Sequence, residues 1–316
     1  MVTHQSHIGD APGQTDSSKK LARLHLPLDL TGKRVLDIGC NEGFFTNVAA
    51  ERGASQVVGI DMDARFLAEA KARYAQDRVI FLEQGWSSLP EGPFDYVLWT
   101  SAMHYELDPA EVLRRIANAL SPSGTLILEC GVHQVPGKEM IYSIRHDGGL
   151  WYPSVPFIEE AFSDAGLTYR MVSHAELVGT DPVPRVVYHC TKRIPTVMLI
   201  SGAPGSGKTN LSHLMKENAT KQISLDHFVA RIAYAKWHHN DLQKSIARNV
   251  DKGNLGKIYH GIDQDGLTND YISLLAKAVA ATDKLVVIEG YMTEIQVETL
   301  INQLKGRAKV WMSVQQ

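Results

Sequence analysis

The chain has 316 residues, which at roughly 150 residues per domain is a length typical of about two domains, each large enough to bury a core. Hydrophobic residues make up 44% of the chain and charged residues 21%, which excludes disordered, fibrous and membrane-embedded classes. The formal net charge of −3 gives no overall positive field for a polyanion. We therefore expect nucleic acid to be an unlikely partner, unless a local basic face exists.

The cysteines and the N-terminus indicate a cellular compartment. Cys40, Cys130 and Cys190 are too widely spaced for a paired zinc site and too few for a disulfide framework, so a reducing environment is expected. Residues 1–20 are polar, lack the apolar run of a secretory signal and predict a flexible tail. No run of about 18 apolar residues follows, so we expect a cytoplasmic protein without membrane insertion.

Two series of alternating elements follow the tail. From Lys33 onward, short apolar runs alternate with amphipathic helical segments, a pattern typical of βαβ units on a parallel sheet. A second series with its own glycine-rich turn begins at Thr196. The sequence thus predicts an α/β protein with two doubly wound domains, residues 21–193 and 194–316, with the boundary near residues 192–195.

The first glycine-rich loop lies in VLDIGCNEGFFT, residues 35–46. A strand there ends at Asp37, and the chain turns through Gly39 and Gly43 into a helix, so that a ligand can approach the helix N-terminus. The next strand ends in Asp61, just over 20 residues after Gly39, where a carboxylate can accept both hydroxyls of a ribose. The full G-x-G-x-x-G pattern is absent, which argues against NAD.

Further motifs follow this loop in order. They are QGW at residues 84–86, FDYVLWTSAMHYE and LSPSGTLILEC. Together with the loop and Asp61 they resemble the class I S-adenosylmethionine-dependent methyltransferases over about residues 30–135, and this resemblance implies a Rossmann-like fold. It also implies that the methionine part of S-adenosylmethionine is held by Asp37, Gly39, Cys40 and Gly43, the ribose by Asp61, and the adenine by Met62, Gln84, Gly85 and Trp86. The alternatives are a helix-capping role for the strand-end aspartates and a core position for Trp86.

Acceptor contacts are expected just beyond the strand FDYVLWTS. His104 and Tyr105 follow it at the carboxyl end of the sheet, where α/β folds bind ligands, so His104 is a candidate base or substrate contact. It would otherwise cap the next element. The aromatic, Gly- and Pro-rich residues 145–157 resemble a substrate-covering loop. Its candidate contacts are Arg145, His146, Trp151 and Tyr152, with a packing role as the alternative for Trp151.

The second glycine-rich loop, GAPGSGKT at residues 202–209, matches G-x-x-x-x-G-K-[ST] in full. An apolar strand precedes it and a helical segment follows, which is the context of a P-loop that binds ATP or GTP. Backbone N–H groups would surround a phosphate, Lys208 would neutralise its oxygens, and the Thr209 hydroxyl would bind Mg²⁺. The predicted nucleotide-binding residues are Gly202, Gly205, Ser206, Gly207, Lys208 and Thr209.

Two later acids extend this second site. Asp226 lies at the end of the predicted strand QISLDHF and is a candidate base that takes a proton from an acceptor hydroxyl; Glu289 lies at the end of the predicted strand KLVVIEG and is a candidate magnesium contact. A helix cap and a surface strand end are the alternatives. With the P-loop, these residues resemble P-loop kinases of small molecules and polynucleotides, including the zeta-toxin-like group. The basic and aromatic residues 231–257 form either a phosphate-binding surface or a solvated helix.

The second domain departs from that kinase pattern. Residues 197–316 are few for such a kinase, and we expect its arginine-bearing lid and last strand to be missing, so that the domain is truncated or minimal. The whole sequence predicts a bifunctional enzyme that uses S-adenosylmethionine, ATP and Mg²⁺ to methylate and phosphorylate one small molecule or glycan. The alternatives are a methyltransferase regulated by a nucleotide-sensing P-loop domain and an RNA-end kinase-methyltransferase.

Overall fold

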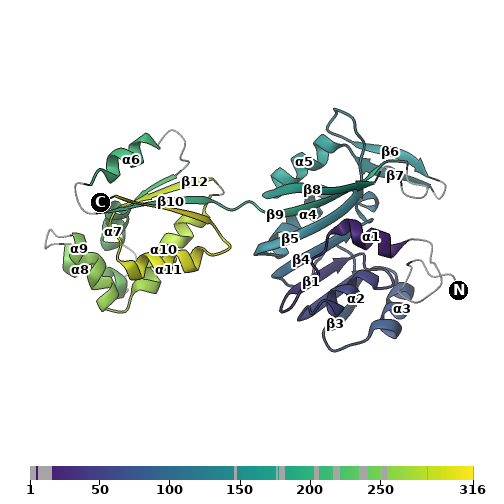
Figure 1. Cartoon of the computed structure of the whole chain (residues 1–316), viewed down its shortest axis with the longest axis horizontal. Coiled ribbons are helices and arrows are strands. Elements are labelled where there is room, and N and C mark those ends of the chain that lie inside the picture. Colours follow the sequence, from purple (N-terminus) through teal and green to yellow (C-terminus); the bar gives the residue numbers. More distant parts are fainter. Residues whose placement is uncertain are drawn as a thin grey trace. The chain divides into compact units, whose positions relative to one another are not determined.

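The structure is a computed structural model, and it forms two compact units, Met1–Arg193 and Ile194–Gln316 (Figure 1). It describes residues 5, 16–145, 148–175, 177, 182–202, 206–215, 221–234, 241–250, 255–282 and 284–315. None of the helices in these ranges is long and apolar enough to cross a membrane.

A seven-stranded sheet forms the centre of the N-terminal unit. Its strand order is β3-β2-β1-β4-β5-β9-β8; neighbours from β3 to β5 are parallel, whereas β9 runs antiparallel to both β5 and β8. The strands are β1 (Arg34–Ile38), β2 (Gln56–Asp61), β3 (Val79–Glu83), β4 (Phe94–Thr100), β5 (Leu120–Gly131), β8 (Leu167–Ala175) and β9 (Arg185–Lys192). The carboxyl ends of β1, β2 and β4 therefore meet at one edge of the sheet.

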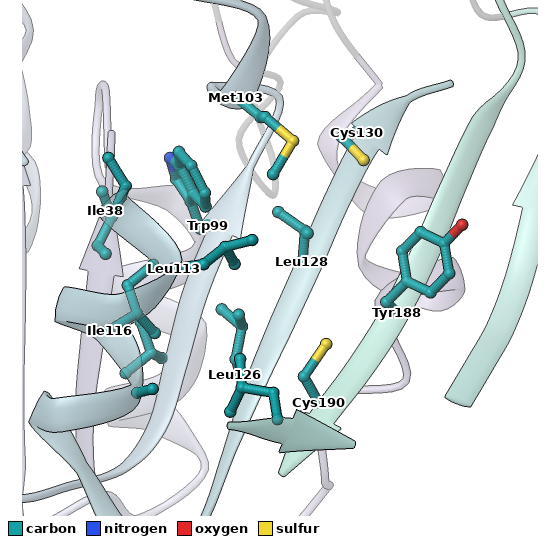
Figure 2. Close-up of a cluster of buried hydrophobic side chains, with 14 of the residues drawn as sticks. Ile38, Trp99, Met103, Leu113, Ile116, Leu126, Leu128, Cys130, Tyr188 and Cys190 are labelled. Carbon is teal, nitrogen blue, oxygen red and sulfur yellow. The ribbon is translucent and has the colours of Figure 1, made fainter. Parts of the chain in front are cut away.

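Helices cover both faces of this sheet. They are α1 (Ser17–Leu24), α2 (Phe44–Glu51), α3 (Ala64–Tyr74), the short 3₁₀ helix η1 (Met103–Tyr105), α4 (Pro109–Ala119) and α5 (Val155–Asp164). Side chains alternate between the two faces along each strand. Leu98 packs against side chains of α1 and α2. Its neighbour Trp99 packs on the other face, against side chains of α4 and α5, in the cluster drawn in Figure 2. This two-sided burial explains the nearly continuous apolar runs of the central strands.

A two-stranded hairpin lies between β5 and α5 in the chain. It consists of β6 (Met140–Arg145) and the antiparallel β7 (Gly148–Pro153). The side chain of Tyr152, in β7, is fully buried and lies against His104 in η1. The hairpin thus contributes directly to the edge of the sheet at which β4 ends.

Helix α1 begins inside the predicted flexible tail. It starts at Ser17, after Asp16 accepts a hydrogen bond from the Lys19 N–H at 3.0 Å, and the Lys20 side chain, 16% exposed, pairs with Glu129. The prediction of a flexible tail through residue 20 is therefore wrong for residues 17–20 and for Gln5, which is buried and donates its N–H to Glu42 at 2.8 Å. The amphipathic pattern of the short segment SSKKLARL, with Leu24 fully buried, explains why it folds onto the sheet.

The C-terminal unit is a second α/β unit around a four-stranded parallel sheet of order β11-β12-β10-β13. Its strands are β10 (Thr196–Gly202), β11 (Lys221–Ser224), β12 (Leu285–Glu289) and β13 (Lys309–Gln315). Its helices are α6 (Lys208–Leu214), α7 (Leu225–Ala233), α8 (Asp241–Val250), α9 (Leu255–Gln264), α10 (Thr268–Ala280) and α11 (Glu294–Leu304). The mixed α/β class and a Rossmann-like sheet in the N-terminal region are confirmed, whereas a P-loop fold for residues 194–316 stays a prediction.

Candidate active site

The first glycine-rich loop is a tight turn between β1 and α2. Gly39 and Gly43 have φ angles of +71° and +82°, values that favour glycine. The N–H groups of Gly39 and Cys40 both donate to the Ile60 carbonyl oxygen, each at 2.9 Å, which ties the loop to the end of β2. A Cβ atom on Gly43 would lie only 2.9 Å from the Phe81 ring, so this position has no room for a side chain.

Two carboxylates lie at the ends of the strands beside this loop. Asp37 is buried and accepts a hydrogen bond from the Thr46 hydroxyl at 2.7 Å, and burial raises its pKa to about 6. The two carboxylate oxygens of Asp61 accept the N–H groups of Asn41 and Asp63 at 2.8 and 2.9 Å. Each of these oxygens keeps a lone pair for a further donor, such as a ribose hydroxyl.

The predicted adenine contacts lie next to Asp61. The Gln84 N–H donates to the Asp61 carbonyl oxygen at 2.9 Å, and its side chain donates to the Ser88 carbonyl oxygen. Met62 is 73% exposed, and its sulfur lies 3.0 Å from where a Cβ of Gly85 would be. The structure therefore brings Asp61, Met62, Gln84 and Gly85 together.

Trp86 is held at the same edge by a polar contact. Its indole N–H donates to Glu106 at 2.6 Å, and its ring lies 6.2 Å from the ring of Trp99. One edge of the indole also comes within 4.0 Å of where a Cβ of Gly39 would be. Trp86 thus lies between the core and the glycine-rich loop, and its contact with adenine stays a prediction.

The candidate acceptor residues are buried to different extents. His104 is 4% exposed and stacks on Tyr152 with ring centroids 5.4 Å apart, whereas Tyr105 is 60% exposed. Arg145 ends β6, but its side chain lies outside the described residues, as does all of His146. The structure thus joins His104, Tyr105 and Tyr152 in one group, and the catalytic role of His104 stays a prediction.

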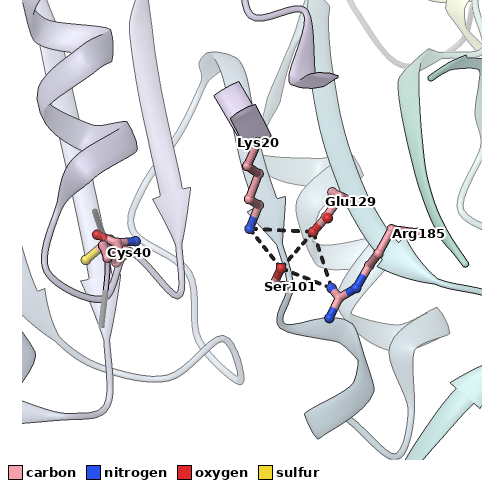
Figure 3. A network of polar contacts seen from close by, with 6 residues as sticks. Lys20, Cys40, Ser101, Glu129 and Arg185 are labelled. Carbon is pink, nitrogen blue, oxygen red and sulfur yellow. Dashed lines mark hydrogen bonds and ion pairs between the residues drawn. The ribbon is translucent and has the colours of Figure 1, made fainter. Parts of the chain in front are cut away.

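A buried network of charged residues was missed by the sequence analysis (Figure 3). The Ser101 hydroxyl donates to Glu129 at 2.7 Å and contacts the side-chain nitrogens of Lys20 and Arg185 at 2.8 and 3.0 Å. The two cations also pair with Glu129 at 3.5 and 3.3 Å. One signal was available in the sequence: the acid Glu129 interrupts the apolar run LILEC, so it needs a buried partner.

This network adjoins the glycine-rich loop through the residue that follows Ser101. The Cβ of Ala102, the residue after Ser101, lies 3.4 Å from where a Cβ of Gly39 would be. Burial alone would raise the pKa of Glu129, but the charges of Lys20 and Arg185 outweigh it and hold that pKa at about 2. The ionised Glu129 thus shares one negative charge between two cations.

The three cysteines are free thiols, and all are buried. Burial raises the pKa of each thiol well above its usual value. Cys40 lies in the glycine-rich loop, where its sulfur packs against β2 at Gly59. Its contribution to this site is therefore packing and backbone position.

The predicted nucleotide site in the C-terminal unit is described only in part. Gly202 ends β10, Ser206 and Gly207 precede α6, and Lys208 begins that helix. Gly205 and the Thr209 side chain lie outside the described residues.

The two acids of that site lie at the carboxyl edge of the same sheet. In register, Ser224 of β11 and Ile200 of β10 both pair with Glu289 of β12. Asp226, in the first turn of α7, accepts a hydrogen bond from the Tyr259 hydroxyl at 3.1 Å. The parallel register therefore brings the end of β10, Asp226 and Glu289 to one edge.

Comparisons with known proteins concern the N-terminal region. Residues 29–151 match a family described as a methyltransferase domain. A tRNA U34 carboxymethyltransferase of Ectopseudomonas mendocina is 32% identical over 160 residues, 48% of this chain and 49% of that protein. A ubiquinone biosynthesis O-methyltransferase of Neisseria meningitidis is 36% identical over 102 residues, 30% of this chain and 43% of that protein. The chain thus spans about half the length, or less, of these curated relatives.

A solved structure gives a further likeness. An S-adenosylmethionine-dependent methyltransferase from Mesorhizobium loti superposes with a TM-score of 0.45 at 21% identity, covering 56% of this chain and 98% of that one.

These comparisons require one correction. The prediction that nucleic acid is an unlikely partner is wrong, because several similar proteins are named for a nucleoside of tRNA. That prediction rested on the net charge of the whole chain, which does not show where the positively charged side chains lie. Residues 29–151, which contain the parallel strands β1 to β5 of the Rossmann-like sheet, therefore resemble a methyltransferase domain.

Proposed function

We propose that the N-terminal unit transfers a carboxymethyl or methyl group from an S-adenosyl sulfonium donor to a nucleoside of tRNA. The observation that carries this proposal is that Lys20 and Arg185 contact Ser101, the residue before Ala102, whose Cβ lies 3.4 Å from where a Cβ of Gly39 would be. A carboxymethyl group ends in a carboxylate, and an ammonium and a guanidinium are charged donors that suit a carboxylate. The names of the tRNA-modifying relatives support the same acceptor.

The chain's own residues would hold the donor in the proposed site. Asp37 would accept a hydrogen bond from the donor's ammonium group, and Asp61 would accept the ribose hydroxyls beside Met62. When bound, the donor supplies a transferable carbon on a positively charged sulfur, which is an excellent leaving group.

Alignment is then the main requirement for the reaction. The lone pair of the acceptor atom forms a bond to the transferred carbon, the carbon–sulfur bond breaks, and its electron pair neutralises the sulfur. The acceptor's proton passes to a base. His104, at the carboxyl end of β4, is our candidate for that base.

Nucleoside mass spectrometry of unmodified tRNA after reaction with the purified protein tests this proposal. Two donors are compared, S-adenosylmethionine and its analogue whose sulfur carries a carboxymethyl group. We expect Asp61→Ala to abolish transfer from both donors and Asp63→Ala, which removes the half-buried carboxylate two residues away, to preserve it. Lys20→Met should lower transfer of carboxymethyl more than transfer of methyl. No product on tRNA with either donor would refute the proposal.

A second candidate function concerns residues 194–316. We propose that they bind ATP with Mg²⁺ and transfer its terminal phosphoryl group to an RNA hydroxyl. The complete P-loop motif before α6 and the convergence of Asp226 and Glu289 at the same sheet edge support this. In this proposal Lys208 neutralises phosphate oxygens, Asp226 accepts the hydroxyl proton, and Thr209 and Glu289 hold the metal.

Transfer of labelled phosphate from ATP to RNA measures this second activity. Lys208→Ala and Asp226→Asn should each abolish the labelled product, and Lys277→Ala, on the distant part of α10, should not. ATP-dependent methylation without a phosphorylated product would instead support a nucleotide-sensing role and overturn the kinase proposal.

A further inference from the structure

The C-terminal unit contains a cavity of about 400 Å³ between α8 and α9. Basic side chains dominate its charged lining: Arg248 from α8, and Lys257 and His260 from α9, with Asp265 as the carboxylate. The volume lies in the range of small-ligand pockets and exceeds that of a bare phosphate ion. A ligand here would therefore be an anion with an attached group.

Close packing of the two helices shapes this cavity. Gly261 of α9 faces Asn249 of α8, and a Cβ on Gly261 would lie 2.7 Å from the amide nitrogen of Asn249. That amide is fixed because it donates to the Ser245 carbonyl oxygen at 3.1 Å within α8. The glycine lets α9 approach α8 so that Arg248 and Lys257 line the same cavity.

The basic groups keep donors for a ligand. The Arg248 guanidinium donates to Asp265 at 3.1 Å and to the Lys244 carbonyl oxygen at 3.3 Å, and a guanidinium has five N–H donors. Lys257 is exposed, and within the described ranges no carboxylate lies at ion-pair distance from its ammonium group. The His260 ring nitrogen lies 3.1 Å from the Tyr291 hydroxyl, which leaves its other nitrogen for a further contact.

Contacts of α9 connect this cavity with the predicted phosphoryl-transfer edge. His260 touches Tyr291, which follows Glu289 by two residues at the end of β12. The preceding residue, Tyr259, donates to Asp226 at 3.1 Å. Adjacent residues of one helix thus contact the cavity and the candidate base, from sides of the helix about 100° apart.

We propose that the α8–α9 cavity binds a phosphate ester group of the molecule on which the C-terminal unit acts. A guanidinium, an ammonium and an imidazole around one space match the several oxygens and the charge of a phosphate ester. The role of that ester in positioning an acceptor rests on the proposed kinase function. Binding of the ester to the cavity does not depend on it.

Nuclear magnetic resonance of the His260 ring in the full chain reports on this cavity directly. The signal is assigned by its loss in His260→Gln. We expect it to shift saturably when a short RNA oligonucleotide is titrated at constant ionic strength, with about tenfold weaker binding in Arg248→Gln and in Lys257→Gln. Lys244→Gln, which removes an exposed lysine of α8 outside the cavity lining, should bind as the unaltered protein does.

Two further arms separate the possible outcomes. Inorganic phosphate should shift the same signal at least about tenfold more weakly than the oligonucleotide; equal binding would make free phosphate the ligand and overturn the ester proposal. In Lys208→Ala, the His260 signal should respond to the oligonucleotide as in the unaltered protein. Loss of phosphoryl transfer in that variant would therefore not affect the measurement of binding to the cavity. A linear, unsaturable shift, or equal affinity in all variants, would also overturn the proposal.

Discussion

Asp37 is a buried carboxylate whose protonation matters for its proposed role. Its pKa of about 6 lies above the ordinary value because burial disfavours the charge, although the Thr46 hydroxyl opposes this. Below that pH the free protein holds a neutral carboxyl group, which must lose its proton to form a charge-assisted hydrogen bond with an ammonium group.

We therefore expect donor affinity to be constant above about pH 6 and to fall by about tenfold per pH unit below it. Calorimetric titration with S-adenosylmethionine between pH 5 and 8 measures this. Thr46→Val should move the break to higher pH because it removes the hydrogen bond that stabilises the charged form. Asp63→Asn should not change the pH at which donor affinity begins to fall. If that pH were also unchanged in Thr46→Val, the assignment of the pH dependence to Asp37 would be contradicted.

Glu129 is a second buried carboxylate, and its charge affects the stability of the N-terminal unit. Glu129→Gln removes the buried carboxylate with which Lys20 and Arg185 both pair, so we expect a loss of about 3–5 kcal/mol in the free energy of unfolding. The matched control is Glu111→Gln on α4, whose pairs with Arg114 and Arg115 are exposed and should contribute less than about 1 kcal/mol. Urea denaturation at pH 7 compares the two variants, and similar losses would contradict this account.

The same network has a defined pH window. Because the folded-state pKa of Glu129 is held at about 2, its stabilising contribution is present above the ordinary pKa of 4.5 and is lost as the pH falls toward 2. Between pH 5 and 7 the ionisation of Glu129 should therefore add no pH dependence to stability.

The sequence predicted the position of a residue where its neighbours in the chain form the local structure, while the binding roles of these residues stay predictions. Asp37, Gly39 and Gly43 could be found because strand, turn and helix succeed one another, and the structure brings Asp61, Met62 and Gln84 to the same edge. The Lys20–Glu129–Arg185 network joins residues more than 50 positions apart. No local pattern specifies such pairing, which depends on the antiparallel alignment of β9 with β5.

At the scale of elements, the turn between β1 and α2 depends on Gly39 and Gly43, of which Gly43 has less space for a side chain. Gly43→Ala combines a left-handed backbone with a contact of 2.9 Å to Phe81, so we expect a loss of about 2–4 kcal/mol. Gly32→Ala is the matched control, because Gly32 also has a positive φ, of +73°, but open space around it, and should cost about 1–2 kcal/mol. Thermal denaturation compares the two variants. If both lost the same free energy of unfolding, the contact with Phe81 of β3 would not contribute to the cost at Gly43.

Element boundaries were harder to predict than the elements themselves. The alternation of strands and helices is visible in the sequence because the central strands are buried on both faces. Helix α1 was missed as a packed element because its eight residues are mostly polar, and its position is fixed by buried Leu24 and by Lys20. The β6–β7 hairpin was expected only as a covering loop, since its Gly- and Pro-rich sequence gives a weak strand pattern.

At the scale of the whole molecule, the two units have separate hydrophobic cores. A ligand bound to one unit should therefore stabilise that unit alone. At about 100 times its dissociation constant, S-adenosylmethionine should add about 2.7 kcal/mol to the N-terminal unit, with no change in the other. Hydrogen exchange measures the stability of both units in one sample, with and without S-adenosylmethionine. If the ligand slowed exchange in β10 and β12 as well as in β4 and β5, the two units would unfold as one.

The distribution of thiols gives this chain a built-in reporter of unfolding. All three cysteines lie in the N-terminal unit, each is 1% exposed or less, and each thiol is held in its protonated form by burial. A thiol-alkylating reagent can therefore modify the chain only when the N-terminal unit opens, since the thiolate is the reactive species. Alkylation rates of the unaltered protein thus measure the opening of one unit in the presence of the other, without a fluorescent label or a truncated chain.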